Sequence, residues 1–380
     1  MIPPIRSPIR VASAILPTSM SDPHKILVVQ PSWVGDAVMA TPTLRAIRER
    51  YPDAHIAYMM KRYVKPLYTG QPWADQLITY RSGKTRKRAG KGLFDLARRL
   101  RGAKFDLAIL LPNSFQTALV CKMANIPRVV GYERDGRGFL LSDKLLPRKE
   151  KGKFVPTPIV KYYMGLAHYL GSQARDLSLK LFVTDSERRE AVEVLEQAGL
   201  PRDVEHPAAS GKPPLILLNP GAQFGVAKCW PAEYFAALAD RMIDELSATI
   251  LISGAPRERR IIEAIYRSMR HPPVDLLSKG ATLGTLKEIV RRCDLMITND
   301  TGPRHIAAAF DVPVITLFGP THPEWTEINF ARERKLAVKV FCGPCQKKTC
   351  PLDHRCMTRL TPAMVFDAAL SMLPQARQTV

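Results

Sequence analysis

The strongest constraint on the fold is an alternation of short apolar runs with amphipathic stretches of helix length, and it occurs twice along the chain. In the first half the apolar runs are KILVVQ (25–30), IAYMM (56–60), LITY (77–80), DLAILL (106–111) and VVGY (129–132). In the second half they are LILLNPG (215–221), TILISG (249–254), LMITND (295–300) and VITLFG (314–319). Strands that alternate with helices form βαβ units around a parallel sheet. We therefore predict an α/β protein with two doubly wound parallel-sheet domains of Rossmann-like topology.

The length supports the same division, because 380 residues exceed what one ordinary core organises. We predict an N-terminal domain at 25–204, a linker at 205–214, and a C-terminal domain at 215–360. A helix and tail follow at 361–380, with Thr361 as the N-cap and Pro362 in the first helical position. Residues 1–24 hold five prolines and no long apolar core, so we interpret them as a disordered extension rather than a signal peptide.

The composition narrows the possible classes of protein. No run of about 18 uncharged apolar residues is present, which argues against an integral membrane protein. Four of the seven cysteines fall within 342–356, a distribution that fits a reducing compartment better than a disulfide framework. We expect a cytoplasmic protein.

The net charge of +21 points to anionic partners, and the excess is concentrated between Arg81 and Lys104, where ten basic residues accompany one acid, Asp95. This stretch is either a solvated surface or a site for a polyanion. A nucleic-acid-binding protein would explain the charge, but no RNP motif or helix-turn-helix pattern is present. A nicotinamide-dependent dehydrogenase would fit the sheets, but no strand leads into G-x-G-x-x-G.

Ligands of open parallel sheets bind beyond the carboxyl ends of the strands, so the strand-to-helix turns of two facing domains should line a cleft. The first such turn, PSWVGDAV, puts Asp36 in the first turn of a helix. There it either caps the helix or acts chemically.

Two turns of the second half carry features of an anion site. NPGAQFGVAKCWP (219–231) combines Gly221 and Gly225 with Lys228, although it lacks the spacing of a P-loop. NDTGPRHIAAA (299–309) places Pro303 as a helix start after Gly302. Each has a structural alternative: the first turn could be a surface loop with a solvated lysine, and His305 in the second could be a structural histidine. Together they suit transfer of a group from a diphosphate.

These motifs, with ILLPNSFQTALVCKMANIPRVVGY (109–132), resemble glycosyltransferase family 9 in order and spacing over roughly 25–375. The resemblance implies a GT-B fold, with the acceptor held by the N-terminal domain and a nucleotide-sugar by the C-terminal one. It implies an inverting transfer of heptose from ADP-heptose to the lipid A inner core, with Asp36 as general base and Lys228 with the helix start after Gly302 stabilising ADP. Family members carry an apolar pair where this chain has Pro303 and Arg304.

Further roles follow from the same resemblance. Donor contacts fall on Gly221, Gln223, Phe224, Glu258, Asp300, Thr301, Gly302 and His305. Acceptor contacts fall on Trp33, Asn113 and Ser114, to which the basic stretch adds Arg86, Lys87 and Arg88. Transfer to another core position or glycan is the open alternative.

No Asp-x-Asp motif is present, so we expect catalysis without a metal cofactor. The basic stretch would hold the acceptor at the inner face of the inner membrane, and no nucleic-acid partner is expected. Cys342, Cys345, Cys350 and Cys356, with His354, have half the spacing of a structural zinc site, but the second half lacks a tight C-x₂-C. We prefer reduced cysteines without a catalytic part.

Overall fold

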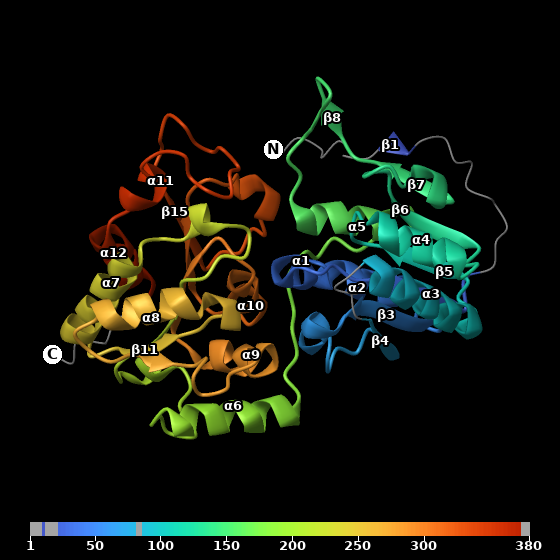
Figure 1. The fold of residues 1–380 in the computed structure, drawn as a ribbon. Coiled ribbons are helices and arrows are strands. Elements are labelled where there is room, and N and C mark those ends of the chain that lie inside the picture. Colours follow the sequence, from blue (N-terminus) through green and yellow to red (C-terminus); the bar gives the residue numbers. More distant parts are fainter. Residues whose placement is uncertain (1–9, 12–21, 81–85, 374–380) are drawn as a thin grey trace. The chain divides into compact units, whose positions relative to one another are not determined.

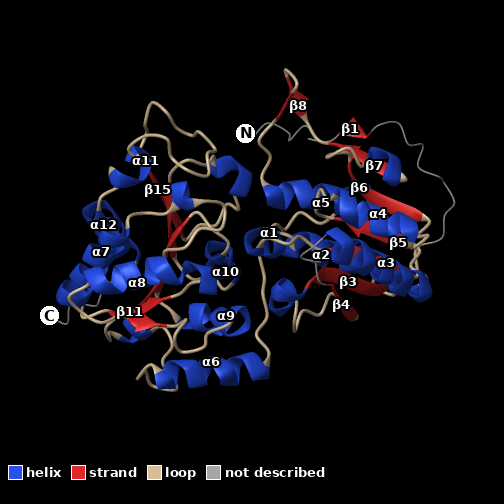
Figure 2. Cartoon of the chain, viewed as in Figure 1, coloured by secondary structure: helices blue, strands red, loops and turns tan. Residues whose placement is uncertain are grey.

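The computed structural model describes residues 10–11, 22–80 and 86–373, and the chain forms two compact units (Figure 1). The first unit comprises residues 1–178 with 324–328, and the second comprises 179–323 with 329–380. In each unit a parallel sheet is flanked by helices (Figure 2), as the alternating pattern predicts.

The sheet of the first unit has the order β1-β7-β6-β5-β2-β3-β4, and all of its pairings except that of β1 with β7 are parallel. Its strands are β1 (Arg10–Val11), β2 (Lys25–Val29), β3 (His55–Lys61), β4 (Gln76–Tyr80), β5 (Leu107–Leu110), β6 (Arg128–Tyr132) and β7 (Asp143–Leu146). A separate hairpin pairs β8 (Lys149–Glu150) with β9 (Lys153–Phe154). The five strands predicted for this half are confirmed, whereas β1, β7 and the hairpin carry no apolar signal.

The helical segments of the first unit are α1 (Val34–Met39), α2 (Thr41–Arg50), η1 (Arg62–Leu67), α3 (Arg86–Ala103), α4 (Phe115–Met123), η2 (Gly138–Leu140) and α5 (Ile159–Tyr169). Helices α3 and α4 pack on the sheet face that carries Leu27 and Val29. Ile26 and Val28, which point to the opposite face, are also fully buried. Both faces are therefore covered, as in doubly wound sheets.

The sheet of the second unit has the order β12-β11-β10-β13-β14-β15, and its pairings are all parallel. Its strands are β10 (Leu215–Asn219), β11 (Thr249–Ile252), β12 (Val274–Asp275), β13 (Leu295–Asn299), β14 (Val314–Phe318) and β15 (Glu333–Ala337). The four predicted strands are confirmed. The edge strand β15 escaped prediction because its sequence, ERKLA, is mostly charged, which is common at sheet edges.

The helical segments of the second unit are α6 (Asp185–Gln197), η3 (Pro207–Ser210), η4 (Val226–Lys228), α7 (Ala232–Leu246), η5 (Pro256–Glu258), α8 (Arg259–Ser268), α9 (Leu283–Arg292), α10 (Pro303–Ala309), α11 (Arg355–Thr358) and α12 (Pro362–Met372). A further segment, η6 (Pro323–Thr326), belongs to the first unit from residue 324 onward. Helix α10 starts at Pro303, as predicted. Helix α12 is capped by Thr361, whose hydroxyl accepts a hydrogen bond from the Met364 N–H. It packs with α7 in the core of the second unit.

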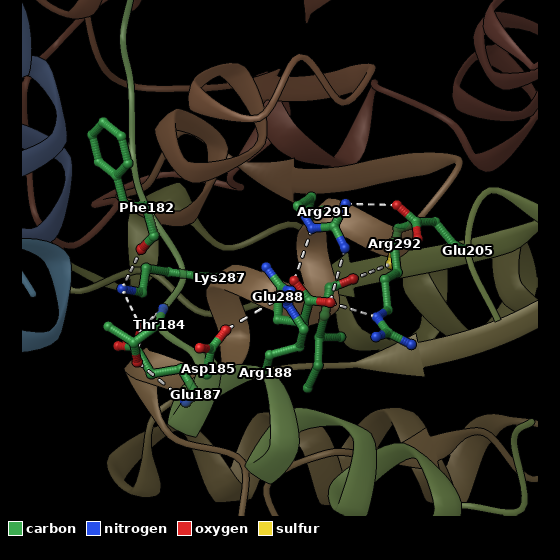
Figure 3. Close-up of polar contacts among 12 residues, drawn as sticks. Phe182, Thr184, Asp185, Glu187, Arg188, Glu205, Lys287, Glu288, Arg291 and Arg292 are labelled. Atoms are coloured by element: carbon green, nitrogen blue, oxygen red, sulfur yellow. Dashed lines mark hydrogen bonds and ion pairs between the residues drawn. The ribbon is translucent and has the colours of Figure 1, made fainter. Parts of the chain in front are cut away.

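The division between the units differs from the predicted boundary. The sequence places the linker at 205–214, but the division falls between Ser178 and Leu179, so that residues 179–204 belong to the second unit. Figure 3 shows the reason, a polar network that fastens α6 to α9. The fully buried ammonium of Lys287 on α9 lies 2.9 Å from the Glu187 carboxylate on α6, and it donates a hydrogen bond to the Phe182 carbonyl at 2.7 Å.

The predicted extension at 1–24 is described only in part. Residues 1–9 and 12–21 lie outside the described residues, whereas β1 (Arg10–Val11) joins the sheet edge beside β7. Of the predicted C-terminal tail, residues 374–380 also lie outside the described residues. Among the helices that the structure describes, none has the length and apolar character needed to cross a bilayer.

Candidate active site

A pocket of about 400 Å³ opens in the first unit at the carboxyl ends of neighbouring strands. Trp33 and Asp36 reach it from the turn after β2, and Asn113 and Ser114 reach it from the turn after β5. These two strands are parallel neighbours, so the turns after them meet at one edge of the sheet. The structure thus brings together four residues that the sequence singled out.

Asp36 lies in the first turn of α1 without capping it. The N-cap residue is Trp33, and no side chain accepts a capping hydrogen bond there. Within residues 22–80 and 86–373 the structure shows no hydrogen bond or ion pair to the Asp36 carboxylate. Burial raises the pKa of this carboxyl from 3.8 to about 6. The capping role, one of the two sequence-based alternatives for Asp36, is therefore excluded.

The Asp36 carboxylate raises the pKa of two buried tyrosines. Burial raises the pKa of Tyr68 and of Tyr163 far above 10, and the neighbouring Asp36 carboxylate adds to both shifts. Tyr163 also lines the pocket. Because both phenols stay protonated, Asp36 is the one group among these three that titrates near neutral pH.

Four basic side chains line the same pocket, and the sequence analysis did not single them out: Lys61, Arg134, Arg148 and Lys161. Lys61 ends β3 and Arg134 follows β6, so their position after a strand was an available signal. Arg148 and Lys161 belong to β7–α5, where nothing in the sequence marks them. Four cations beside one carboxylate favour an anionic ligand.

Asn113 is held in place by a buried guanidinium. Arg137 is fully buried, and it donates hydrogen bonds to the carbonyls of Tyr132 and Pro112 and, at 3.2 Å, to the Asn113 side-chain oxygen. The Tyr162 hydroxyl donates to the same oxygen at 3.1 Å. The Asn113 amide oxygen is therefore occupied, and its NH₂ group is the part that a ligand would meet.

The remaining predicted acceptor residues, Arg86, Lys87 and Arg88, form the first turn of α3. Their side chains lie outside the described residues. Residues 81–85 of the same basic stretch also lie outside them. Further along α3, Arg98, Arg99 and Arg101 are exposed.

In the second unit the two predicted anion-binding turns also meet. Strands β10 and β13 are parallel neighbours, and the turns at 219–231 and 299–309 follow them. Asn299 joins the turns: its amide donates to the Pro220 carbonyl at 2.6 Å, and its oxygen accepts from the Trp230 N–H at 3.1 Å. This bridge fixes one turn against the other.

Lys228 and Asp300 form an ion pair across these turns. The Lys228 ammonium lies 2.5 Å from the Asp300 carboxylate, and both side chains are almost fully buried. Burial alone would raise the pKa of Asp300, but Lys228 and Arg304 hold it below its ordinary value. The Thr321 hydroxyl also donates to this carboxylate at 2.8 Å. Asp300 thus holds Lys228 in one position.

Arg304, the second residue of α10, is fully buried behind this pair. Its guanidinium lies 3.3 Å from Asp300 and 3.5 Å from Glu333 on β15. Lys335 approaches Glu333 from the other side at 3.7 Å. Lys228, Arg304 and Lys335 thus pair with Asp300 and Glu333, while a third carboxylate, that of Glu258, lies against Gly221 of the other turn. Arg304 therefore gives the buried Asp300 carboxylate a second cation besides Lys228.

Two glycines of the first turn permit close approaches. A Cβ atom on Gly221 would overlap the carboxylate of Glu258, which also accepts a hydrogen bond from the Ala255 N–H at 2.7 Å. A Cβ atom on Gly225 would overlap the backbone of Lys348. The Glu258 side chain could shift away from a Cβ at position 221, whereas the Lys348 backbone leaves room only for glycine at position 225.

The other predicted donor residues surround the pair. Gln223 is exposed, and the Phe224 ring lies 5.5 Å from the Lys228 ammonium. Thr301 and Gly302 are half-buried at the start of α10. Burial, followed by the charges of Arg304 and Lys228, lowers the pKa of His305 far below 6.5. His305 is therefore a neutral imidazole and adds no positive charge.

The four clustered cysteines line a small pocket with Arg355 and Lys347. The thiol pKa of Cys356 is raised by burial and then by Cys350, Cys342 and Cys345, so the four lie near one another. Among the residues that the structure describes, no three histidine, cysteine or acidic side chains are placed to hold a metal ion.

Comparisons with known proteins identify the family of the chain. The family model described as glycosyltransferase family 9 (heptosyltransferase) matches residues 93–355. The chain is 32% identical to lipopolysaccharide heptosyltransferase 2 of Escherichia coli K12 and 30% identical to that of Salmonella typhimurium, with 92% of this chain and 99% of each relative covered. The solved structure of E. coli ADP-heptose lps heptosyltransferase II matches with a TM-score of 0.74 at 27% identity, over 92% of this chain and 98% of that one. The architecture is thus that of GT-B heptosyltransferases, and the chain belongs to glycosyltransferase family 9, the heptosyltransferases.

Proposed function

We propose that this heptosyltransferase moves heptose from ADP-heptose to the inner core of lipopolysaccharide, with inversion at the anomeric carbon. The observation that carries the proposal is Asp36: a carboxylate with a pKa of about 6, free of protein partners among the described residues, in a pocket lined by cations. The names of the relatives, lipopolysaccharide heptosyltransferase 2 and ADP-heptose lps heptosyltransferase II, support the same donor and acceptor.

Asp36 acts as the general base. Its carboxylate accepts the proton of an acceptor sugar hydroxyl while that oxygen attacks the anomeric carbon, and the bond from that carbon to the diphosphate oxygen breaks. A pKa near 6 makes Asp36 a stronger base than an exposed aspartate and leaves most of it ionised at neutral pH.

Lys228 stabilises the departing ADP. The diphosphate gains negative charge as the bond breaks, and a preorganised ammonium beside it lowers the barrier. Asp300 positions this ammonium by pairing with Lys228, and Arg304 and Thr321 in turn hold the Asp300 carboxylate. The start of α10 after Gly302 provides further N–H donors, and Glu258 contacts the nucleotide ribose. No step in this proposal uses a metal ion.

The pocket of the first unit receives the acceptor. Its basic side chains, Lys61, Arg134, Arg148 and Lys161, match the phosphates and acidic sugars of a lipid A inner core. Trp33, Asn113 and Ser114 contact the sugar that is modified. The enzyme then acts as a peripheral protein at the cytoplasmic face of the inner membrane, where Arg86, Lys87 and Arg88 add to the attraction.

Transfer to a different core position or to another glycan is the second candidate, because the basic lining specifies an anionic acceptor and not one sugar. Incubation with ADP-heptose and a series of truncated core acceptors, followed by mass measurement of the products, separates the two. The proposal predicts that one truncated inner-core acceptor gains a single heptose. Gain of heptose only by a non-lipopolysaccharide glycan would replace it with the second candidate.

A further inference from the structure

Two phenylalanine rings lie side by side on the surface of the first unit, next to the acceptor pocket. Phe115 and Phe139 are 40% and 72% exposed, and their ring centroids are 6.0 Å apart. Single exposed apolar residues are ordinary on soluble proteins, but adjacent large rings indicate an interaction surface. We call Phe115 and Phe139 the phenylalanine pair.

The backbone around Phe139 is fixed by buried neighbouring residues. Phe139 is the middle residue of η2 (Gly138–Leu140), whose neighbours Leu140 and Leu141 are buried in the core with α4. The buried, multiply hydrogen-bonded Arg137 precedes η2, and Gly138 lies against the Glu133 side chain. The exposure of Phe139 is therefore built into the fold.

The pair is contiguous with the acceptor pocket. Ser114, which lines the pocket, is the N-cap of α4, and Phe115 is the first residue of that helix. Arg134, also in the pocket lining, stacks on the Phe154 ring at 4.1 Å. The phenylalanine pair thus begins one residue beyond the pocket lining and does not belong to it.

The hairpin that follows the pocket residue Arg148 carries exposed lysines, beside Glu150, which pairs with Arg148. Arg148 lines the pocket and leads into the β8–β9 hairpin, in which Lys149 and Lys151 are exposed. The Lys149 ammonium lies 4.8 Å from the centroid of Phe154. Aromatic rings beside lysines are the combination that binds an anionic lipid surface, because the rings enter the headgroup region while the lysines attract the charged lipids.

We propose that the phenylalanine pair and the hairpin lysines, Lys149 and Lys151, form a docking surface for an anionic lipid bilayer. The inference rests on the proposed function, in which the acceptor sugars belong to a lipid whose acyl chains stay in the membrane. Docking through this surface places the mouth of the acceptor pocket at the headgroups, where those sugars are. A protein partner or a second copy of the chain would require no anionic lipid.

Vesicle binding of the full chain tests the proposal without any turnover. The probes are vesicles of phosphatidylglycerol with phosphatidylethanolamine, and vesicles of phosphatidylcholine alone. The wild-type chain is expected to sediment with the anionic vesicles only. The Phe115→Ser/Phe139→Ser variant is expected to bind them about tenfold or more weakly, because two rings no longer leave water. Phe341→Ser, at a ring of the second unit that is 80% exposed, is the control and should bind like wild type.

Charge reversal tests the second half of the surface. Lys149→Glu/Lys151→Glu should lose binding to anionic vesicles, and added salt should reduce the difference from wild type. Equal binding by wild type and either double variant, or an equal loss in Phe341→Ser, would overturn the proposal. So would a wild-type dimer, seen by sedimentation velocity, that the phenylalanine substitutions dissociate.

A separate readout distinguishes failure of this surface from failure of the proposed function. Neither phenylalanine lines the pocket, so transfer of heptose to an acceptor without acyl chains should be unchanged in Phe115→Ser/Phe139→Ser. Transfer to the same core carried by intact lipid A in vesicles should fall. If the wild-type chain binds anionic vesicles as expected but transfers no heptose, the proposed function fails and the docking surface stands. If the wild-type chain transfers heptose but the substitutions do not change vesicle binding, the docking surface fails and the proposed function stands.

Discussion

The ammonium of Lys228 and the carboxylate of Asp300 lie 2.5 Å apart in a nearly water-free setting, although 72 residues separate them in the sequence. Because Asp300 is buried and also bound to Arg304 and Thr321, it is placed to orient Lys228 rather than to meet a ligand itself. Substitution of Lys228 and substitution of Asp300 should therefore change the kinetics of the enzyme in different ways.

Lys228→Ala should lower kcat by about 10² to 10³, because it removes a charge that acts on the leaving diphosphate. Asp300→Asn should keep part of this activity and raise the KM for ADP-heptose, since Lys228 remains but is less well oriented. Asp311→Asn, which alters an exposed ion pair with Arg332, is the matched control. Steady-state kinetics with varied ADP-heptose measure all three. A Lys228→Ala enzyme with wild-type kcat would contradict the role given to this residue.

The rate should depend on pH through Asp36. With a pKa of about 6, the carboxylate is protonated below that value and can no longer accept a proton. We expect kcat/KM for the acceptor to rise with pH and to level off above a midpoint near 6. The neighbouring Tyr68 and Tyr163 do not titrate in this range, because their pKa values are far above 10. A midpoint near the ordinary aspartate value of 3.8 would show that Asp36 is not in this environment during turnover.

The same shift predicts an effect on stability. The pKa of Asp36 is raised in the folded state, so the folded chain binds more protons than the unfolded chain between pH 3.8 and about 6, and the stabilisation from protonated Asp36 is lost as pH rises through that window. Asp36→Asn removes the cost of the buried charge. At about pH 8 its free energy of unfolding should exceed that of wild type by about 1–3 kcal/mol, the lower end allowing for partial exposure of the group.

Denaturant unfolding at several pH values measures this difference. Below pH 3.8 the two chains should be about equally stable, because Asp36 is then neutral in both states. A variant that is less stable than wild type at about pH 8 would mean that the carboxylate has a stabilising partner.

Gly225→Ala should disturb the turn that carries Lys228, because the added Cβ would overlap the Lys348 backbone. We expect a loss of stability of about 1–3 kcal/mol and a raised KM for ADP-heptose. Gly102→Ala is the control: its Cβ meets nothing within 4 Å, and it lies in α3, where alanine is favoured over glycine by about 0.5–1 kcal/mol. Thermal unfolding measures the stability of both variants, and steady-state kinetics with varied ADP-heptose measure their KM. Unchanged stability and KM in Gly225→Ala would show that the backbone around Lys348 can move away without loss of stability.

Much of the fold and part of the site follow from local sequence. The apolar runs predict β2, β5, β10 and β13, and the rule that ligands lie beyond strand ends then selects Asp36, Lys228 and Asp300. Arg148 and Lys161 were missed because their place in the pocket depends on how β7–α5 folds back, which no local pattern encodes. The burial of Arg304 was missed for a similar reason, since its partner Glu333 lies on a charged edge strand. The boundary at Ser178 depends on the contact of Lys287 with Glu187, 100 residues apart.

The most direct test of the central claim is heptose transfer by the wild-type and Asp36→Asn enzymes, each incubated with ADP-heptose and the same truncated inner-core acceptor. Mass measurement of the acceptor, together with the anomeric configuration of the new bond, is the readout. The account predicts that the wild-type enzyme adds one heptose with inverted configuration and that the Asp36→Asn enzyme, although folded, is slower by about 10² to 10⁴. Equal transfer by the two enzymes, or retention of configuration, would contradict it.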